Sequence, residues 1–376
     1  MTTRFTTTVR RLLASLFMAV PLFVHAAGNA IVIGQAIDLS GPNAAIGRDY
    51  VAGIKTHFDA INSNGGINGK RIQYIVRDDR GEPGLAVALC AELIERDQVD
   101  YLFGGVGDNV IRAVLDAPAF KRSGQILYAP LAATQLSGSH VLFWRPGYKQ
   151  EISHIFAHFG KLGLKSVGIA YQESAANQDA YRSLTSEIQQ RGMQLTGVAK
   201  IKSNASQPET ETEAKRLALS KPGFVIVIAD TLSTGLFLKE FRKHDAQTFV
   251  AGTSLINLST LRELAGAKAV EWTVFSQVVP NPNSATSLIQ IDHLNMMRKY
   301  RDEAVSSLTL EGFAAAKTLT KAIQQAKHGR SGLQELIAQD GGFDLGGLSI
   351  VFNANGNRLS NYLDIALFKK GSGLMF

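Results

Sequence analysis

AIVIGQAIDLSGPNAAIGRDYVAGIKTHFDAI, residues 30–61, is the stretch that decides the fold. Its first eight residues, Ala30–Ile37, are mostly apolar and β-branched, which is typical of a strand buried on both faces. Asp49–Ile61 then places apolar residues such as Tyr50 and Ile54 at helical spacing, so it predicts an amphipathic helix. A buried strand, a loop with small residues and a helix together form one βα unit.

The same alternation continues along the chain. Short β-branched runs such as Arg71–Val76 and Val167–Tyr171 are separated by helical segments of about 10–15 residues, which favours parallel sheets with helices on both faces. The 376 residues exceed the usual size of one core, so two doubly wound lobes are predicted. The end of the chain differs, because Leu348–Phe352 and Tyr362–Phe368 are expected to pair with each other as an antiparallel hairpin.

The first residues have the pattern of a secretory signal peptide. Arg4, Arg10 and Arg11 precede the apolar stretch Leu12–Val24, which is shorter than the roughly 20 residues that span a bilayer. Residues 1–26 are therefore predicted to be removed, with cleavage after Ala26 or the following alanine. The single cysteine, Cys90, lies far from this point, so a lipid anchor is not expected. These features predict a periplasmic location.

Composition argues against several classes of protein. A hydrophobic fraction of 45% and a charged fraction of 19% indicate an ordinary globular protein held together without disulfides. The net charge of +7 falls to +4 without the leader, whose three arginines are balanced by no acid. Because no arginine-rich helix or lysine run with interleaved aromatics occurs, nucleic-acid binding is not expected.

No coherent set of catalytic or cofactor-binding residues is found. His154 and His158 have zinc-ligand spacing, but Ile155 stands where a zinc hydrolase needs glutamate. Residues 65–70 are one residue too short for a phosphate-binding loop. Residues 104–107 lack the third glycine of a dinucleotide fingerprint. We therefore predict no enzyme activity, no metal and no cofactor.

Ligands of doubly wound sheets bind where the carboxyl ends of the strands meet. The loops to examine are therefore those after each strand, and several are rich in glycine and small hydroxyl residues. Tight βα turns favour the same residues for purely structural reasons, so composition alone does not decide between the two interpretations. These loops are residues 38–47, 104–109, 131–136, 171–179, 230–234 and 252–255.

Several motifs with their spacing resemble the periplasmic leucine/isoleucine/valine-binding proteins of ABC transporters. The resemblance begins with Asp38-Leu39-Ser40-Gly41-Pro42 and Ile46-Gly47, and it extends over essentially the whole mature chain. Further matching motifs are residues 61–69, Asp78-Asp79, Ala132-Ala133-Thr134, residues 145–151, Gln277-Val278-Val279-Pro280, residues 311–317 and 343–347. The resemblance implies an α/β fold of two doubly wound parallel-sheet lobes joined by three crossovers, the type I periplasmic binding protein fold. Lobe 1 would then comprise residues 27–143 and 277–346, and lobe 2 residues 144–276 and 347–376.

The resemblance also implies where a solute binds. In the family, small residues in the first lobe hold the ligand's carboxylate and amino groups, and Ala132, Ala133 and Thr134 match that element. Branched-chain amino acid binders carry an acid on the second lobe, where this chain has Thr253 and Ser254, and a tyrosine that is also missing here. The candidate ligand contacts are Ile46, Asp108, Asn109, Ala132, Ala133, Thr134, Tyr171, Thr253, Ser254 and Gln277.

Asp108 stands where the family commonly has a serine, and two roles stay open for it. It either faces the cleft and replaces the missing ammonium partner, or it caps the following helix, in which case the ligand is an acid or amide without an amine. The predicted function is capture of a small organic solute by hinge closure and delivery to an inner-membrane ABC permease, by a monomer. The alternative is a ligand-sensing module that acts with a separate signalling partner.

Overall fold

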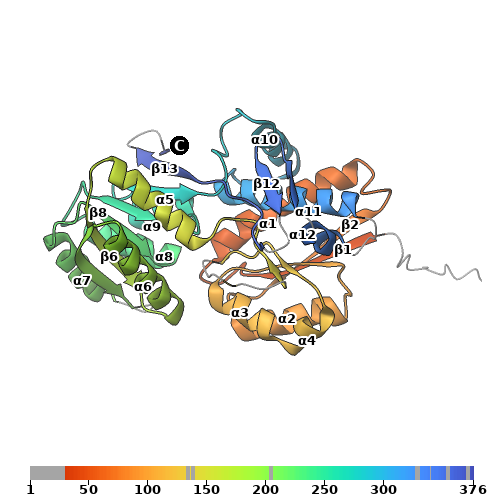
Figure 1. The fold of residues 1–376 in the computed structure, drawn as a ribbon, viewed down its shortest axis with the longest axis horizontal. Helices are drawn as coiled ribbons and strands as arrows, with labels where there is room; N and C mark the ends of the chain where they lie inside the picture. The colour runs from red at the N-terminus through yellow and green to blue at the C-terminus, as the bar shows by residue number, and fades with distance from the viewer. Residues whose placement is uncertain are drawn as a thin grey trace, which may run out of the picture.

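Two mainly parallel sheets organise the chain into two lobes that lie beside each other in the computed structural model (Figure 1). The structure describes residues 30–132, 136, 140–202, 206–326, 331–338, 340–352, 356–369 and 373–376. The predicted signal peptide and two candidate contacts, Ala133 and Thr134, lie outside these residues. None of the described helices is both long and apolar enough to cross a membrane.

The first lobe is built around a five-stranded parallel sheet in the order β2-β1-β3-β4-β5. Its strands are β1 (Ala30–Ile37), β2 (Arg71–Asp78), β3 (Tyr101–Phe103), β4 (Leu127–Tyr128) and β5 (Val141–Leu142). Its helices are α1 (Ala44–Ser63), α2 (Pro83–Glu95), α3 (Asp108–Asp116), α4 (Pro118–Ser123), α10 (Leu288–Tyr300), α11 (Ser307–Gln325) and α12 (Gly332–Ile337). A small antiparallel pair, β11 (Gly341–Asp344) with β12 (Ser349–Phe352), joins this lobe.

The second lobe contains a seven-stranded sheet in the order β14-β13-β10-β9-β8-β6-β7. Strands β6 to β10 run parallel, while β13 is antiparallel to β10 and to β14. The strands are β6 (Ser166–Gln172), β7 (Gln194–Ile201), β8 (Phe224–Ile228), β9 (Phe249–Gly252), β10 (Thr273–Gln277), β13 (Asp364–Lys369) and β14 (Gly373–Met375). The helices are α5 (Tyr148–Lys161), α6 (Ala175–Gln190), α7 (Gln207–Leu219), α8 (Thr231–Phe241) and α9 (Leu258–Ala265).

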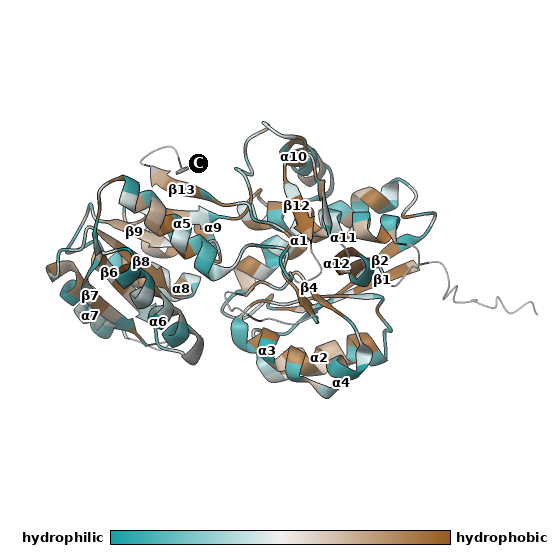
Figure 2. Cartoon of the chain, in the orientation of Figure 1, coloured by the Kyte–Doolittle hydropathy of each residue, from teal (hydrophilic) through white to brown (hydrophobic). Residues whose placement is uncertain are grey.

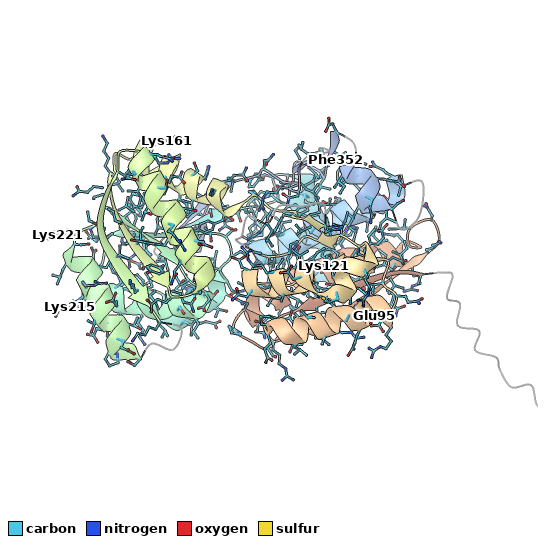
Figure 3. The ribbon with its side chains drawn as sticks, turned by 60° about the horizontal axis from the view of Figure 1, so that its bottom comes forward. Glu95, Lys121, Lys161, Lys215, Lys221 and Phe352 are labelled. Carbon is cyan, nitrogen blue, oxygen red and sulfur yellow. The ribbon has the colours of Figure 1, made fainter. Side chains whose placement is uncertain are left out.

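Apolar side chains gather between the helices and the sheets, where the strands are mainly brown in Figure 2. In β1 and β8 almost every residue is buried, as the near-continuous β-branched runs predict. The charged side chains labelled Lys161, Lys215 and Lys221 in Figure 3 lie on the second lobe away from the first. The basic surface they contribute is therefore remote from the contact between the lobes.

The predicted C-terminal hairpin is wrong. Strand β12 pairs with β11, whereas β13 pairs with β10 and β14, so the two segments enter different sheets. Ile350 and Phe352 of β12 pack into the core of the first lobe. The lobe boundaries stay a prediction, and this packing favours moving the last of them beyond residue 352.

A buried ion pair holds the first connection between the lobes. Arg145, between β5 and α5, donates from Nε and Nη2 to the two carboxylate oxygens of Glu311 on α11, at 2.9 and 2.8 Å. Both side chains are about 1–2% exposed. Because neither charge is hydrated, each depends on the other.

Glu311→Gln is expected to lower the free energy of unfolding by about 3–5 kcal/mol, because it leaves the Arg145 charge buried without its counter-ion. Urea denaturation at pH 7 measures the change. Glu95→Gln is the matched control, since Glu95 pairs with Arg122 at the surface, where both side chains are more than half exposed, and an exposed pair contributes at most about 1 kcal/mol. Similar losses of unfolding free energy in the two variants would show that the buried Arg145–Glu311 pair stabilises the fold no more than an exposed pair.

Glycines allow α1 and α11 to pack at backbone contact. A Cβ atom on Gly53 would lie 2.0 Å from the carbonyl oxygen of Thr309, and one on Gly312 would lie 2.2 Å from that of Tyr50. The two helices therefore approach more closely than any larger residue permits.

Gly53→Ala is expected to destabilise the protein by about 1–3 kcal/mol, because α1 must move away from α11. The midpoint of urea unfolding measures this change. Gly84→Ala, at the second position of α2 with open space around it, should leave stability unchanged or raise it by up to about 1 kcal/mol. A loss in both variants would mean that the close helix contact is not the cause.

Candidate functional site

The candidate site is a cleft of about 260 Å³ between the lobes, which we call the interlobe cleft. Loops after β3 and β4 and the start of α1 form its first-lobe wall, and loops after β6, β8 and β9 form its second-lobe wall. Its polar lining residues are Asn43, Asp108, Tyr148, Gln172, Asn177, Asp230, Thr234 and Thr253. Its other lining residues are Ile46, Val106, Gly107, Leu131, Ala132, Val227, Ile228, Ala229, Gly252, Leu255, Ile256 and Phe275.

The first-lobe wall is shaped by the loop after β1. Asp38 accepts hydrogen bonds from the backbone N–H groups of Gly41 and Asn43, at 2.6 and 2.8 Å, and this closes the turn. A Cβ atom on Gly41 would lie 2.1 Å from the Arg80 carbonyl oxygen, so the loop requires glycine there. The fixed turn brings Asn43 and Ile46 to the edge of the cleft.

Asp108 lines the first-lobe wall and is the first residue of α3. The N-cap position is occupied by Gly107 in a positive-φ conformation, so Asp108 does not hold the N-cap that one interpretation of the sequence gave it. Its carboxylate lies in the first helical turn, where it interacts favourably with the positive end of the helix dipole.

The second-lobe wall presents a carboxylate fixed by its neighbours. Asp230 caps α8 by accepting from the N–H of Ser233 at 2.7 Å. Gln172 donates to its other oxygen at 2.8 Å and accepts from its backbone N–H at 3.2 Å. Asn177 donates to the Gln172 carbonyl oxygen at 2.9 Å. The strand ends of β6 and β8 are thereby locked together, and Asp230 has little freedom to turn away from the cleft.

Tyr148 supplies a hydroxyl group without a partner. The residue is 8% exposed, begins α5 directly after the crossover and lines the cleft, and its Oη makes no hydrogen bond. Burial, together with the carboxylates of Glu151 and Asp108, raises the pKa of Tyr148 well above its ordinary value. The hydroxyl therefore keeps its proton at neutral pH and can donate it to a bound molecule.

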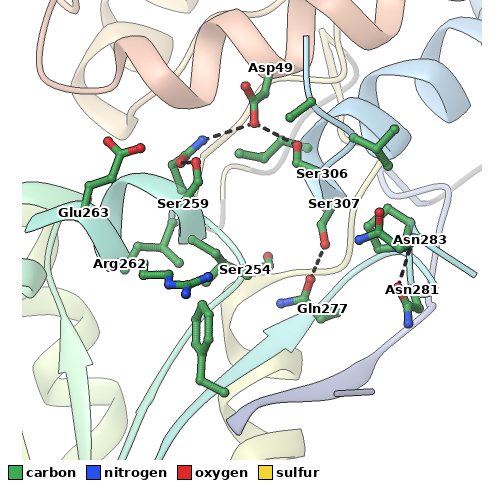
Figure 4. A pocket seen from close by; sticks show the side chains of 18 of the residues that line it. Asp49, Ser254, Ser259, Arg262, Glu263, Gln277, Asn281, Asn283, Ser306 and Ser307 are labelled. Carbon is green, nitrogen blue, oxygen red and sulfur yellow. Dashed lines mark hydrogen bonds between the residues drawn. The ribbon is translucent and has the colours of Figure 1, made fainter. Parts of the chain in front are cut away.

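A second and larger cavity, of about 890 Å³, lies against the β10–α10 crossover, and we call it the hinge groove. Figure 4 shows its lining, including Asp49, Ser254, Ser259, Arg262, Glu263, Gln277, Asn281, Asn283, Ser306 and Ser307. Asn257 crosses between the lobes here, donating to Asp49 Oδ2 at 3.1 Å. Ser307 donates to Gln277 at 2.6 Å. The interlobe cleft is the better candidate site because the strand ends of both sheets converge on it.

The structure divides the candidate contacts among several places. Ile46, Asp108, Ala132 and Thr253 line the interlobe cleft. Ser254 and Gln277 instead line the hinge groove.

Two further candidates line neither cavity. Asn109 is exposed at the start of α3. Tyr171 is 5% exposed and stacks on Tyr181, with ring centroids 4.8 Å apart. Tyr171 is therefore a core residue in this structure.

Tyr148, Gln172, Asn177, Asp230 and Thr234 line the cleft but are absent from the candidate contacts. Four of them lie within residues 171–179 and 230–234, two of the strand-end ranges that the topology indicates. The sequence therefore predicts where the cleft lies, but not which side chains of these ranges line it. Tyr148 lies at the start of a helix after a crossover, and no local signal separates it from a core aromatic.

Comparison with known proteins identifies the family. A family model described as "Periplasmic binding protein" matches residues 30–372. The chain belongs to this family. It is similar to "Leu/Ile/Val-binding protein homolog 1" of Brucella melitensis, with 22% identity over 82% of each chain. It is also similar to "Leu/Ile/Val-binding protein BraC3" of Rhizobium johnstonii, with 24% identity over 85% of each chain.

Solved structures share the fold of this periplasmic binding protein. A substrate-binding periplasmic protein from Ralstonia solanacearum superimposes with a TM-score of 0.83 at 23% identity, covering 92% of this chain and 99% of the other. A "Periplasmic binding Protein Type 1" from Bordetella pertussis Tohama I gives a TM-score of 0.78 at 17% identity, covering 92% and 99%. These likenesses confirm the predicted type I fold.

The described residues of this periplasmic binding protein contain no cluster of three or more histidine, cysteine, aspartate or glutamate side chains that could hold a metal. His154 and His158, the pair with zinc-ligand spacing, lie on α5 outside the lining of either cavity. The cleft offers hydrogen-bond donors and acceptors and an apolar wall, which suit recognition of a small molecule.

Two adjacent aspartates at the end of β2, Asp78 and Asp79, have pKa values shifted in opposite directions. Asp79 is fully buried, with one oxygen bonded to the Gly81 N–H and the other without a partner. Burial, with the charges of Asp38 and Asp78, raises the pKa of Asp79 to about 6. For Asp78, hydrogen bonds from Ser40 and from backbone N–H groups outweigh its slight burial and lower the pKa.

Asp79→Asn is expected to stabilise the protein at pH 7–8 by at most about 3 kcal/mol, since each pKa unit corresponds to about 1.4 kcal/mol. A raised pKa in the folded state favours folding at low pH and loses that contribution as pH rises through about 6, so the advantage of the variant should vanish below about pH 4. Thermal unfolding from pH 3.5 to 8 measures this difference.

Asp78→Asn is the matched control with the opposite sign. Its lowered pKa contributes stability above the unfolded value of 3.8, which is lost as pH falls. This variant should therefore be less stable than the wild type at neutral pH and approach it in acid. The same sign for both variants would contradict the assigned environments.

Proposed function

We propose that this protein is an exported receptor that captures a small organic solute in the interlobe cleft by hinge closure and delivers it to an inner-membrane ABC permease. The observation that supports this proposal is the cleft itself, whose two walls belong to different lobes. A solute that contacts both walls favours the closed state. A solute that contacts a single wall, equally well in the open and closed states, does not shift the equilibrium between them. The protein acts as a monomer, binds and releases without chemistry, and resides in the periplasm after removal of its signal peptide.

The solute is small. The cleft volume of about 260 Å³ lies just below the roughly 300–1,000 Å³ of pockets that hold drug-sized ligands. Relatives named Leu/Ile/Val-binding proteins favour a solute of amino-acid size. The class extends to related acids and amides, because Thr253 and Ser254 replace the acid of branched-chain amino acid binders.

The function is tested by screening the mature protein, refolded to remove carried-over solute, against amino acids, aliphatic amides, dicarboxylates and aromatic acids. A solute at about one hundred times its dissociation constant should add about 2.7 kcal/mol to the free energy of unfolding, which thermal unfolding detects. Small-angle X-ray scattering should then show a smaller radius of gyration with the same solute.

Thr253→Trp, which fills the cleft, should abolish both responses, and Leu219→Trp, on an exposed residue of the second lobe, should leave them intact. Stabilisation without a change in radius would contradict hinge closure. Chemical conversion of a bound compound would contradict a receptor without catalysis.

A sensory role is the second candidate. A relative named "Chemotactic signal transduction system substrate-binding protein BasB", from Halobacterium salinarum, is 28% identical over 28% of this chain. Deletion of the gene should abolish uptake of the identified solute if the protein is a transport receptor. Normal uptake with a lost behavioural or transcriptional response would favour the sensory role.

A further inference from the structure

The charged groups of the interlobe cleft have one sign. Asp108 stands on the first-lobe wall and Asp230 on the second, and the cleft-lining residues among those described include no lysine, arginine or histidine. Closure brings the two walls together and removes water from both carboxylates. A carboxylate that loses water keeps the hydrogen bonds it already accepts, as Asp230 does from Ser233 and Gln172, and its remaining lone pairs then favour hydrogen-bond donors or a positive charge.

Two of the helix ends at the cleft, those of α3 and α8, are occupied by these carboxylates, whereas the start of α1 at Asn43 has no acidic residue in its first turn and contributes about half a positive charge against the two negative ones. Asp108 lies in the first turn of α3, and Asp230 accepts from the Ser233 N–H at the start of α8. A carboxylate on the solute would meet two like charges where an uncapped helix N-terminus would otherwise have attracted it. The electrostatics of the described walls therefore oppose a free acid.

The cleft lining also includes a residue with a hydrogen-bond donor. Tyr148 belongs to the cleft lining, and its hydroxyl is buried and has no hydrogen-bond partner among the described residues. Because this hydroxyl keeps its proton, it suits donation to a carbonyl oxygen of the solute. That hydrogen bond would remove the unfavourable energy of a buried hydroxyl without a partner.

The cleft also has an apolar part. It includes Ile46 from the first lobe and Val227, Ile256 and Phe275 from the second. The hydrogen bond from Gln172 keeps Asp230 in place beside this surface. A solute therefore needs a polar headgroup with both an acceptor and N–H donors, together with a short hydrocarbon tail.

We propose that the solute is a small aliphatic amide, neutral or bearing an additional amine, and not a free acid. Its carbonyl oxygen accepts from Tyr148, its N–H groups donate to the carboxylates of Asp108 and Asp230, and its hydrocarbon contacts the apolar wall. This inference rests on the proposed receptor function and specifies its substrate class.

Two amides and their two corresponding acids test the proposal: isovaleramide with isovalerate, and leucinamide with leucine, each titrated calorimetrically at pH 7 into the refolded mature protein. Isovaleramide or leucinamide is expected to bind at least tenfold more tightly than leucine and isovalerate. Equal or tighter binding of leucine or isovalerate would overturn the amide assignment, as would binding of none of the four.

Variants separate recognition from folding. Tyr148→Phe should weaken amide binding at least tenfold while leaving the melting temperature of the free protein unchanged or higher, because it removes an unpaired buried hydroxyl. Asp108→Asn and Asp230→Asn should reduce the ratio of amide to acid affinity, and asparagine at 230 still caps α8. Asp116→Asn, on an 80% exposed side chain of the same helix α3, should leave the ratio unchanged. An unaltered ratio in both cleft variants would show that the carboxylates do not select the solute.

Failure of this inference is distinguishable from failure of the receptor function. If isovalerate or leucine binds and reduces the radius of gyration, the receptor stands and the amide class is wrong. If no compound of the broad screen closes the lobes, the receptor function itself is wrong.

Discussion

The pair formed by Arg145 and Glu311 is the constraint on which the connection between the lobes depends. The guanidinium lies in a crossover, the carboxylate lies on a central helix of the first lobe, and both are almost completely buried. Burial opposes the charged form of Arg145, but Glu311 and Glu151 raise its pKa above the usual value, so the arginine stays charged. A charge that cannot be hydrated or neutralised must keep its partner, and this fixes the first crossover on α11.

The other connections assemble around this crossover. Phe143 donates its N–H to the Asn357 carbonyl oxygen and accepts from the Leu359 N–H, at 2.8 and 3.0 Å, so the first and last connections run together. Arg358 lies over the Phe143 ring, 4.3 Å from its centroid, and burial beside Arg145 lowers its pKa to about 10. Two crossovers joined by backbone hydrogen bonds hold the connection between the lobes together at one place.

How much the sequence predicts depends on the range of the interaction. The βα units were predictable because burial and helical period are local, and the loops that form the cleft followed from the topology of parallel sheets. The partners of β12 and β13 were not predictable, because these two strands, although consecutive along the chain, pair with strands of different sheets. The short strand β5, only Val141–Leu142, gives no pattern of its own. The position of Tyr171 was not predictable because a strand-end aromatic can turn toward the core or the cleft, and here it stacks on Tyr181.

One helical turn connects the first crossover with the cleft. Glu151, in the first turn of α5, accepts from the Ser254 N–H at 2.8 Å and the Ser276 hydroxyl at 2.7 Å, and so fixes the loop after β9. That loop contributes Thr253 to the interlobe cleft and Ser254 to the hinge groove. Tyr148 begins the same turn and lines the cleft, and its hydroxyl is buried and has no hydrogen-bond partner in the described part of the chain. Because these groups share one helical turn next to the first crossover, the position of Tyr148 and the position of the loop after β9 depend on the same turn. Asn257 adds a direct contact between the lobes by donating to Asp49.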